Sequence, residues 1–511
     1  MLNLSFLVEQ SAKRNPERPA LSFGATTLTY EEFHRKVCQV AHALTKKGIG
    51  YGDNIALLCP NIPQFAVVFF GILKTGASVV PLSILMKPDE ISYHLSDSES
   101  SLFFCFAGTP ELPTGQWGKE GFDKTGSCKH LISIGAASGN ILSLDDFIRD
   151  EEETFECYTT AAEDTAVILY TSGTTGKPKG AELSHLNLFT NAETSTGIVG
   201  SREFEAQLVV LPLFHIFGLT VMMLAGIRKS LHLILLPKFE AGTVYQLIQK
   251  FSITIFAGVP SMYWALLNEE DSEENRNAIK NLRICISGGA SLPVKIIDEF
   301  KTRFDVPIIE GYGMSEGSPV VTFNQLEIGV KAGSIGTPIW GVDVKIVDDD
   351  GNELPEGEKG ELIFRGPNVM KSYYRRPGET AEVLKNGWLF SGDIAVKDQD
   401  GFFFIVDRKK ELIIRGGMNV YPREVEEVMI KHPDISLVAV VGHPDEKLGE
   451  EVKAFVVKKP GSTVSESDIT AWTKQKIATY KYPRIIEFID ELPLSATGKI
   501  LKKLLKTEKK I

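Results

Sequence analysis

Short apolar segments that end in glycine-rich turns recur along the first 330 residues of this chain. Residues 306–310, for example, lead directly into Gly311-Tyr312-Gly313. Helical patterns separate such segments, as residues 63–74 do between the apolar segments 54–59 and 77–82. This β-α-β alternation predicts an α/β fold with a largely parallel sheet covered on both faces. Loops at the carboxyl ends of its strands would meet at one edge, where ligands of α/β folds bind.

The length and a change of pattern predict more than one domain. A chain of 511 residues is too long for a single hydrophobic core. Past residue 330, short strands separated by Asp, Gly and Pro turns predict a small β-rich subdomain. After the charged run Lys409-Lys410-Glu411, the pattern is that of a compact α+β unit. We therefore predict an N-terminal domain over residues 1–408 and a C-terminal domain over residues 409–511, and we expect residues 107–130 to form a surface loop.

A loop rich in hydrogen-bond donors follows the apolar segment 166–170, which we predict to be a strand. Glycines let the backbone approach a ligand closely, and bare N–H groups, hydroxyls and lysines together favour a phosphate over a simple surface turn. The loop departs from the Walker pattern, because Pro178 stands where that pattern has a magnesium-binding hydroxyl. We predict a nucleotide site that is not that of a P-loop kinase or GTPase. The loop residues are Thr171, Ser172, Gly173, Thr174, Thr175, Gly176, Lys177, Pro178, Lys179 and Gly180.

Bulk composition excludes several classes of protein. The net charge of −11 argues against general nucleic-acid binding. The cysteines are scattered without a C-x-x-C pair, so we expect reduced thiols in a cytoplasmic protein. The first residues lack the pattern of a signal peptide. The longest apolar runs are about ten residues, whereas a membrane-spanning helix needs ~20.

The chain closely resembles the adenylate-forming superfamily, which includes acyl-CoA synthetases, peptide-synthetase adenylation domains and firefly luciferase. The resemblance extends from Leu28-Thr29-Tyr30 to the C-terminal lysines and includes every core motif in order. After the phosphate loop these motifs are Leu211-Pro212-Leu213-Phe214-His215, Ser287-Gly288-Gly289-Ala290, Gly311-Tyr312-Gly313-Met314-Ser315-Glu316, Trp388-Leu389-Phe390-Ser391-Gly392-Asp393, Asp407-Arg408-Lys409-Lys410-Glu411 and Pro493-Leu494-Ser495-Ala496-Thr497-Gly498-Lys499.

The resemblance implies an ATP site at these motifs. Tyr312 is expected to stack on adenine, and Asp393 and Arg408 are expected to bind ribose. Ser315 would donate to a phosphate, and Glu316 would supply a hard oxygen ligand for Mg²⁺. On the residues alone, a core tyrosine is the less favoured alternative for Tyr312, whereas Asp393 and Arg408 would more often be a surface turn and an ordinary ion pair. The other cofactor-binding positions implied are the phosphate loop, Gly289, Ala290, Gly311, Gly313 and Met314.

Two further catalytic assignments follow from the resemblance. Lys499 is expected to lie between the carboxylate of the acid and the α-phosphate, where it offsets charge repulsion during adenylation. His215 is either a core histidine or a gate between the acyl pocket and the pantetheine channel. The C-terminal domain is expected to swing about Lys410 between two half-reactions, and to replace Lys499 with the segment that contains Gly417, residues 416–419.

We therefore expect a two-step ligase that uses ATP, Mg²⁺ and CoA. Small and apolar residues around Phe214 to Leu224, 257–260 and 288–290 are expected to line the acyl pocket and favour a medium- or long-chain fatty acid. A coumarate-type aryl acid is the closest alternative. Less favoured alternatives are an enzyme that loads a carrier protein, a luciferase-type oxygenase and a catalytically silent nucleotide-binding protein. We expect no nucleic-acid partner, and a homodimer is compatible with the sequence.

Overall fold

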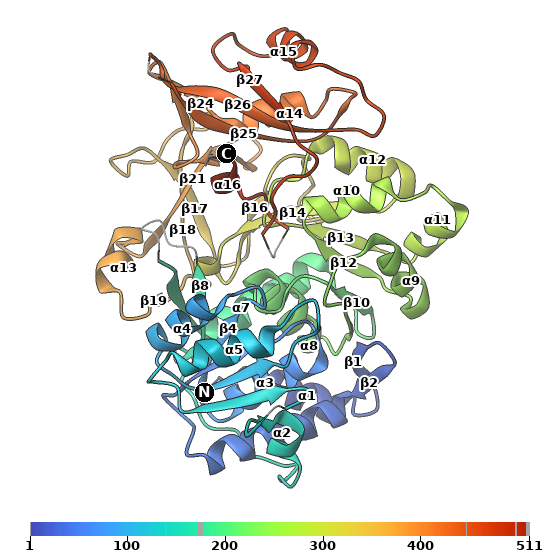
Figure 1. The fold of residues 1–511 in the computed structure, drawn as a ribbon, viewed down its shortest axis with the longest axis vertical. Coiled ribbons are helices and arrows are strands. Elements are labelled where there is room, and N and C mark those ends of the chain that lie inside the picture. Colours follow the sequence, from blue (N-terminus) through green and yellow to red (C-terminus); the bar gives the residue numbers. More distant parts are fainter. Residues whose placement is uncertain (1, 138, 172–176, 446, 496–497, 507–511) are drawn as a thin grey trace.

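The structure, a computed structural model, describes residues 2–137, 139–171, 177–445, 447–495 and 498–506. It has a large N-terminal part with two mainly parallel sheets, a smaller β-rich part and a C-terminal α+β part (Figure 1). The C-terminal part, in orange and red, lies at one end of the molecule, and the first sheet, in blue, lies at the other. This arrangement confirms the predicted α/β class.

The first sheet carries the strand that leads into the phosphate loop. Its strands are β3 Asn54–Leu58, β4 Ser78–Leu82, β5 Ser100–Phe106, β6 His130–Ile134, β7 Leu142–Ser143, β8 Thr165–Thr171, β9 Lys179–Ser184 and β19 Ser372–Tyr373. Their order is β19-β9-β8-β4-β3-β5-β6-β7. The strands from β8 to β7 are parallel, whereas β9 pairs antiparallel with both β8 and β19.

The second sheet carries the other glycine-rich motifs of the N-terminal part. Its strands are β1 Pro19–Phe23, β2 Thr26–Thr29, β10 Ala206–Val209, β11 His232–Leu235, β12 Ile255–Gly258, β13 Ile284–Ser287, β14 Ile308–Gly313, β15 Val320–Phe323 and β16 Thr337–Pro338. Their order is β16-β15-β14-β13-β12-β10-β11-β1-β2. The inner pairs are parallel, and antiparallel pairs occur only toward the two edges among the residues that the structure describes.

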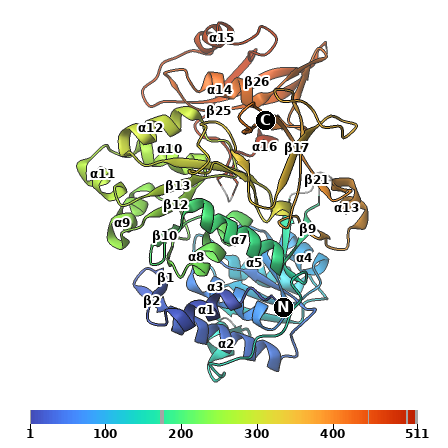
Figure 2. The same cartoon turned by 180° about the vertical axis from the view of Figure 1, so that it is seen from behind.

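Helices fill the space between these sheets and cover their outer faces. In the N-terminal part they are α1 Phe6–Arg14, α2 Tyr30–Lys46, α3 Pro63–Lys74, α4 Pro88–Asp97, α5 Thr114–Asp123, α6 Leu144–Ile148, α7 His185–Val199, the π-helix η1 Phe217–Leu224, α8 Ala225–Arg228, α9 Ala241–Phe251, α10 Pro260–Asn268, α11 Glu273–Ile279, α12 Val294–Phe304 and the 3₁₀ helix η2 Ser315–Gly317. Helix α3 contacts β3 and β4 of the first sheet and β1 of the second, and α7, prominent in Figure 2, contacts both β9 and β15. These two helices therefore join the sheets into one hydrophobic core.

Local sequence explains where α2 and α3 begin. Thr29 Oγ1 accepts a hydrogen bond from Glu32 N at 3.2 Å, and Glu32 Oε2 accepts one from Thr29 N at 2.8 Å. This capping box satisfies backbone donors that a helix start otherwise leaves unpaired. Helix α3 begins with Pro63, which has no N–H to satisfy, and all its residues except Gln64 are buried.

Two segments differ from the sequence-based expectations. Residues 107–130, expected to be a surface loop, contain α5, which packs on α4 and β5. Its glycines allow this packing, because a Cβ at Gly118 would lie 2.2 Å from Cys105 Sγ. The apolar run that includes residues 217–224 forms the buried π-helix η1, where a Cβ at Gly218 would lie 2.4 Å from the Pro212 carbonyl oxygen.

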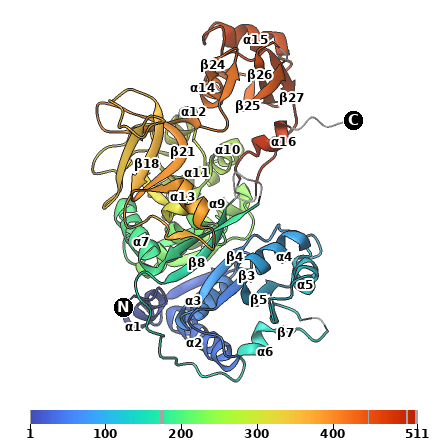
Figure 3. The same cartoon turned by 90° about the vertical axis from the view of Figure 1, so that its left-hand side faces the viewer.

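The remaining two sheets form the β-rich and C-terminal parts. The β-rich sheet contains β17 Asp343–Val347, β18 Gly360–Arg365, β20 Leu384–Lys385, β21 Trp388–Lys397 and β22 Phe403–Arg408, with α13 Pro377–Val383 beside it. The C-terminal sheet contains β23 Ile413–Arg415, β24 Met418–Val420, β25 Ile435–Asp445, β26 Gly449–Lys458 and β27 Ile485–Phe488, with α14 Pro422–Met429, α15 Glu466–Lys474 and α16 Lys502–Lys506. The segment leading into α16 extends from the C-terminal part toward the N-terminal part (Figure 3).

The structure also bears on two predictions from composition. All six cysteines are free thiols. No helix in the described ranges is long and apolar enough to cross a membrane.

Candidate active site

Strand β14 presents Tyr312 between two glycines that the packing requires. A Cβ at Gly311 would lie 2.2 Å from Phe323 Cδ2, and one at Gly313 would lie 2.0 Å from the Pro319 carbonyl oxygen. Since real Cβ atoms do not approach other atoms so closely, only glycine lets β14 and β15 come this near. The Tyr312 hydroxyl donates to Asp393 Oδ2 at 2.6 Å.

Asp393 and Arg408 face each other across two paired strands. They are register partners on β21 and β22, and Arg408 Nε lies 3.3 Å from Asp393 Oδ1. Asp393 is only 7% exposed, so it is not part of a surface turn. The structure thus brings together Tyr312, Asp393 and Arg408, which come from three separate sequence motifs.

Glu316 lies in η2, and its side chain approaches the end of β8, the strand that leads into the phosphate loop. Its Oε1 accepts hydrogen bonds from the Tyr373 hydroxyl at 2.7 Å and from Thr171 Oγ1 at 3.5 Å. Burial raises the pKa of this carboxyl above its ordinary value, while the Tyr373 hydroxyl opposes the rise. Ser315 begins the same 3₁₀ turn, and the Met314 backbone N–H donates to the Pro319 carbonyl oxygen at 3.1 Å.

The phosphate loop connects β8 to β9, whose ends pair at Thr171 and Lys179. Residues 172–176, which carry most of the predicted phosphate ligands, lie outside the described residues. Lys177 is exposed, and its Nζ lies 5.9 Å from the ring centroid of Tyr93. The Tyr93 hydroxyl donates to the Pro178 carbonyl oxygen at 2.8 Å. The described ends of the loop are therefore held beside Glu316 and α4.

Lys499 reaches this site from the C-terminal part. Gly498 before it packs on the N-terminal part, since its carbonyl oxygen accepts from Ser261 Oγ at 3.4 Å and a Cβ on it would lie 2.6 Å from Val259 Cγ2. Burial and the nearby Arg408 guanidinium lower the pKa of Lys499 to about 8, while Glu411 and Asp393 oppose this. An ammonium group thus stands among the residues of the predicted ATP site.

His215 lies close enough to Lys499 for their charges to interact. Removal of the ring from solvent, together with the Lys499 charge, lowers the pKa of His215 to about 4. A ring with this pKa is neutral near pH 7, and its Nδ1 accepts a hydrogen bond from the Phe217 backbone N–H at 3.3 Å. A neutral ring is compatible with both interpretations of His215, as a core histidine and as a gate.

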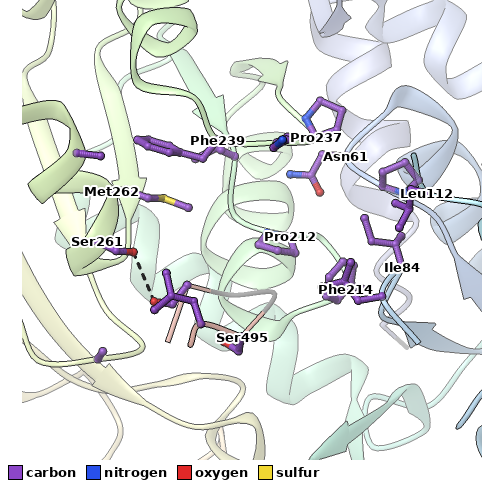
Figure 4. A pocket seen from close by; sticks show the side chains of 18 of the residues that line it. Asn61, Ile84, Leu112, Pro212, Phe214, Pro237, Phe239, Ser261, Met262 and Ser495 are labelled. Carbon is purple, nitrogen blue, oxygen red and sulfur yellow. Dashed lines mark hydrogen bonds between the residues drawn. The ribbon is translucent and has the colours of Figure 1, made fainter. Parts of the chain in front are cut away.

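Gly289 and Ala290 follow β13, which is the neighbour of the Tyr312 strand β14 in the second sheet. Gly289 has φ +80°, a conformation that glycine adopts readily. Ala290 lines a large cavity of about 1680 Å³. Pro212 and Met262 also line it nearer the Ser261–Gly498 contact, and Phe214, Ile84 and Leu112 line it farther along (Figure 4).

Two predicted features lie away from this arrangement. The β23–β24 turn, which contains Gly416 and Gly417, is exposed in this structure. None of the described residues 217–224 lines the cavity, although they were expected to form part of the acyl pocket. Their side chains are instead buried in the core around the π-helix.

Sequence reasoning missed Tyr373, and it placed Lys179 in the phosphate loop without predicting that this lysine is buried. Tyr373 is remote in sequence from Glu316 and becomes its partner only because β19 pairs with β9. Lys179 is 6% exposed, and its Nζ lies 5.2 Å from the Tyr373 ring centroid. The sequence does not distinguish the buried Lys179 from the exposed Lys177 of the same loop.

Known proteins resemble this chain over nearly its whole length. Residues 8–374 match the family described as AMP-binding enzyme, and residues 424–499 match the AMP-binding enzyme C-terminal domain. A long-chain-fatty-acid–CoA ligase of Bacillus subtilis (strain 168) is 35% identical, with 99% of this chain and 94% of the relative covered. A feruloyl-CoA synthase of Amycolatopsis sp is 36% identical, with 96% of each covered.

A solved structure agrees with this relationship. The anthranilate CoA ligase AuaEII in complex with anthranoyl-AMP superposes with a TM-score of 0.91 at 30% identity, covering 98% of this chain and 96% of that one. The chain belongs to the AMP-binding enzyme family, within the adenylate-forming superfamily that contains these AMP-forming acid:CoA ligases.

Proposed function

We propose that this chain activates a medium- or long-chain fatty acid with ATP and transfers the acyl group to CoA. The first half-reaction gives acyl-adenylate and pyrophosphate, and the second gives acyl-CoA and AMP. The large apolar cavity beside Lys499 carries this proposal. Its volume of about 1680 Å³ includes the cleft between the N-terminal and C-terminal parts and exceeds the ~300–1,000 Å³ of most small-molecule pockets, so an extended chain has room beyond the carboxylate.

The chemistry of the cavity wall supports an aliphatic acid. Pro212, Phe214 and Met262, which line the cavity from the N-terminal part, are apolar. Among the described lining residues, the charged ones are either exposed at the surface or belong to the C-terminal part. A second carboxylate or an α-amine would need a buried ionic partner, and the described residues of the N-terminal wall do not supply one.

We assign the roles within the ATP site as follows. Tyr312 stacks on adenine, Asp393 and Arg408 bind ribose, and the phosphate loop with Ser315 binds phosphates. Lys499 offsets repulsion between the carboxylate and the α-phosphate. We place the domain boundary between residues 408 and 409 and the hinge at Lys410, so that the exposed turn at Gly417 would approach the site in the second half-reaction. Lys410→Pro should then impair one half-reaction far more than the other.

The donor set near the phosphate loop fits Mg²⁺. No group of three or more His, Cys, Asp or Glu side chains suited to a metal occurs in the described part of the chain. Mg²⁺ in nucleotide sites uses one or two carboxylates together with substrate phosphates and water. Glu316 is a buried carboxylate that meets this requirement. When bound, the ion would neutralise charge on the phosphates of ATP.

An aryl acid is the second candidate substrate, because the feruloyl-CoA synthase is as similar to this chain as the fatty-acid ligase is. A pyrophosphate-release screen separates the two. Acids from acetate to oleate and a cinnamate series would be compared with and without CoA. The proposal expects the highest kcat/KM for aliphatic acids of medium or long chain, and acyl-CoA formation with free CoA. A preference for cinnamates, or transfer to a carrier protein alone, would refute it.

A further inference from the structure

The Tyr373 backbone is held by strand pairing on one side and by a side-chain acceptor on the other. It lies on β19 opposite Ala181 of β9, and its backbone N–H donates to Thr380 Oγ1 at 3.0 Å. Its side chain is 7% exposed. The strand that anchors Tyr373 is therefore paired with the strand that leaves the phosphate loop.

The Tyr373 side chain connects Glu316 to that loop. Its hydroxyl donates to Glu316 Oε1 at 2.7 Å, a distance within the range of hydroxyl–carboxylate hydrogen bonds. Thr171 Oγ1, at the start of the loop, lies 3.5 Å from the same oxygen. The Lys179 ammonium, at the end of the loop, lies 5.2 Å from the Tyr373 ring centroid. One tyrosine thus contacts Glu316 through its hydroxyl and a loop lysine through its ring.

We propose that Tyr373 is a positioning residue that fixes the Glu316 carboxylate for the Mg²⁺ that accompanies ATP. This inference rests on the proposed function, in which Glu316 is a metal ligand. A donor bonded to one carboxylate oxygen restricts rotation of the group and orients the other oxygen. Partners of this kind change metal affinity by about 10- to 100-fold when they are removed.

The test is Tyr373→Phe, which removes the hydroxyl and keeps the ring against Lys179. Tyr374→Phe is the matched control, because the Tyr374 hydroxyl contacts Asn54 Nδ2 at 3.2 Å and Glu99 Oε2 at 3.4 Å, away from Glu316. Mn²⁺ would be titrated into each full-length protein saturated with a non-hydrolysable ATP analogue, and free Mn²⁺ read by electron paramagnetic resonance. Tyr373→Phe should weaken Mn²⁺ binding about tenfold, and Tyr374→Phe should not.

Two further measurements separate positioning from general damage. Analogue binding in EDTA and the KM for the acid should be unchanged in Tyr373→Phe. In a Glu316→Gln background, Tyr373→Phe should cause no additional loss of Mn²⁺ affinity, since the oriented carboxylate is already absent. Unchanged Mn²⁺ affinity in Tyr373→Phe, or an equal loss in both backgrounds, would overturn the inference.

The design also distinguishes failure of the inference from failure of the proposed function. If Glu316→Gln weakens Mn²⁺ binding but Tyr373→Phe does not, only the role of Tyr373 is wrong. If Glu316→Gln leaves Mn²⁺ affinity unchanged, Glu316 is not a metal ligand, and the inference fails with that assignment. If the wild-type protein releases no pyrophosphate with any acid, the proposed function itself is wrong.

Discussion

Replacing Lys499 with alanine should separate the two half-reactions. The Lys499 ammonium is partly exposed and stands near Arg408 and Asp393. At an effective dielectric constant of ~20, a unit charge about 4 Å from a developing negative charge contributes about 4 kcal/mol. Because 1.36 kcal/mol corresponds to a factor of ten in rate, adenylation should slow by about 10³-fold. Thioester formation from supplied acyl-adenylate does not need this charge and should persist.

The assay measures each half-reaction alone. Pyrophosphate release from ATP and the acid reports the first, and acyl-CoA formation from synthetic acyl-adenylate reports the second. Lys503→Ala is the control, because Lys503 is an exposed lysine of the same segment. Both rates should be nearly normal in this control. Equal loss of both half-reactions in Lys499→Ala, in protein with a native circular dichroism spectrum, would refute the reasoning.

Three further predictions follow from the same geometry. Because burial and Arg408 lower the pKa of Lys499 to about 8, kcat/KM for pyrophosphate release should fall as pH rises through that value and the ammonium is lost; a flat profile to pH 10 would contradict this. Asp393→Asn should raise the KM for ATP about 10- to 100-fold, since hydrogen bonds to charged groups contribute about 1.5–3 kcal/mol. An equal rise in the KM for the acid would argue against ribose binding by Asp393. Gly218→Ala should reduce the free energy of unfolding, measured in urea, by about 1–3 kcal/mol, because the added Cβ would lie 2.4 Å from the Pro212 carbonyl oxygen. Gly242→Ala is the control, because a Cβ there would have no atom within 4 Å, and it should not reduce this free energy.

The arrangement of the candidate site was largely predictable because its motifs follow strands. Gly289 follows β13, and Tyr312 is the second-to-last residue of strand β14. Asp393 and Arg408 lie on paired strands of the β-rich sheet. Parallel order in the second sheet then places several of these segments at one edge. Once the strands are identified, the sequence motifs that follow them are enough to predict that the site lies at this edge of the sheet.

Features that depend on tertiary contacts were not predictable in the same way. Gly115, Gly118 and Gly121 reduce the helical signal of α5, yet Gly118 and Gly121 are what allow it to pack closely on its neighbours. Residues 217–224 are all buried, so no amphipathic periodicity marks their π-helical backbone in the sequence. The contact of Tyr373 with Glu316 depends on a two-residue strand, which is too short to recognise from alternation.

The cavity wall is assembled from many separate loops. Ile84 follows β4, Leu112 follows β5, Phe239 follows β11, and Met262 lies in α10. Connecting segments tolerate sequence change better than the sheets and the α3 helix that hold them. Under the proposed function, in which this cavity holds the acid, acid preference could therefore evolve one wall residue at a time while the nucleotide site on the strands stays unchanged. Such modularity gives a physical reason why relatives of similar identity bear the names of aliphatic and aromatic acid ligases.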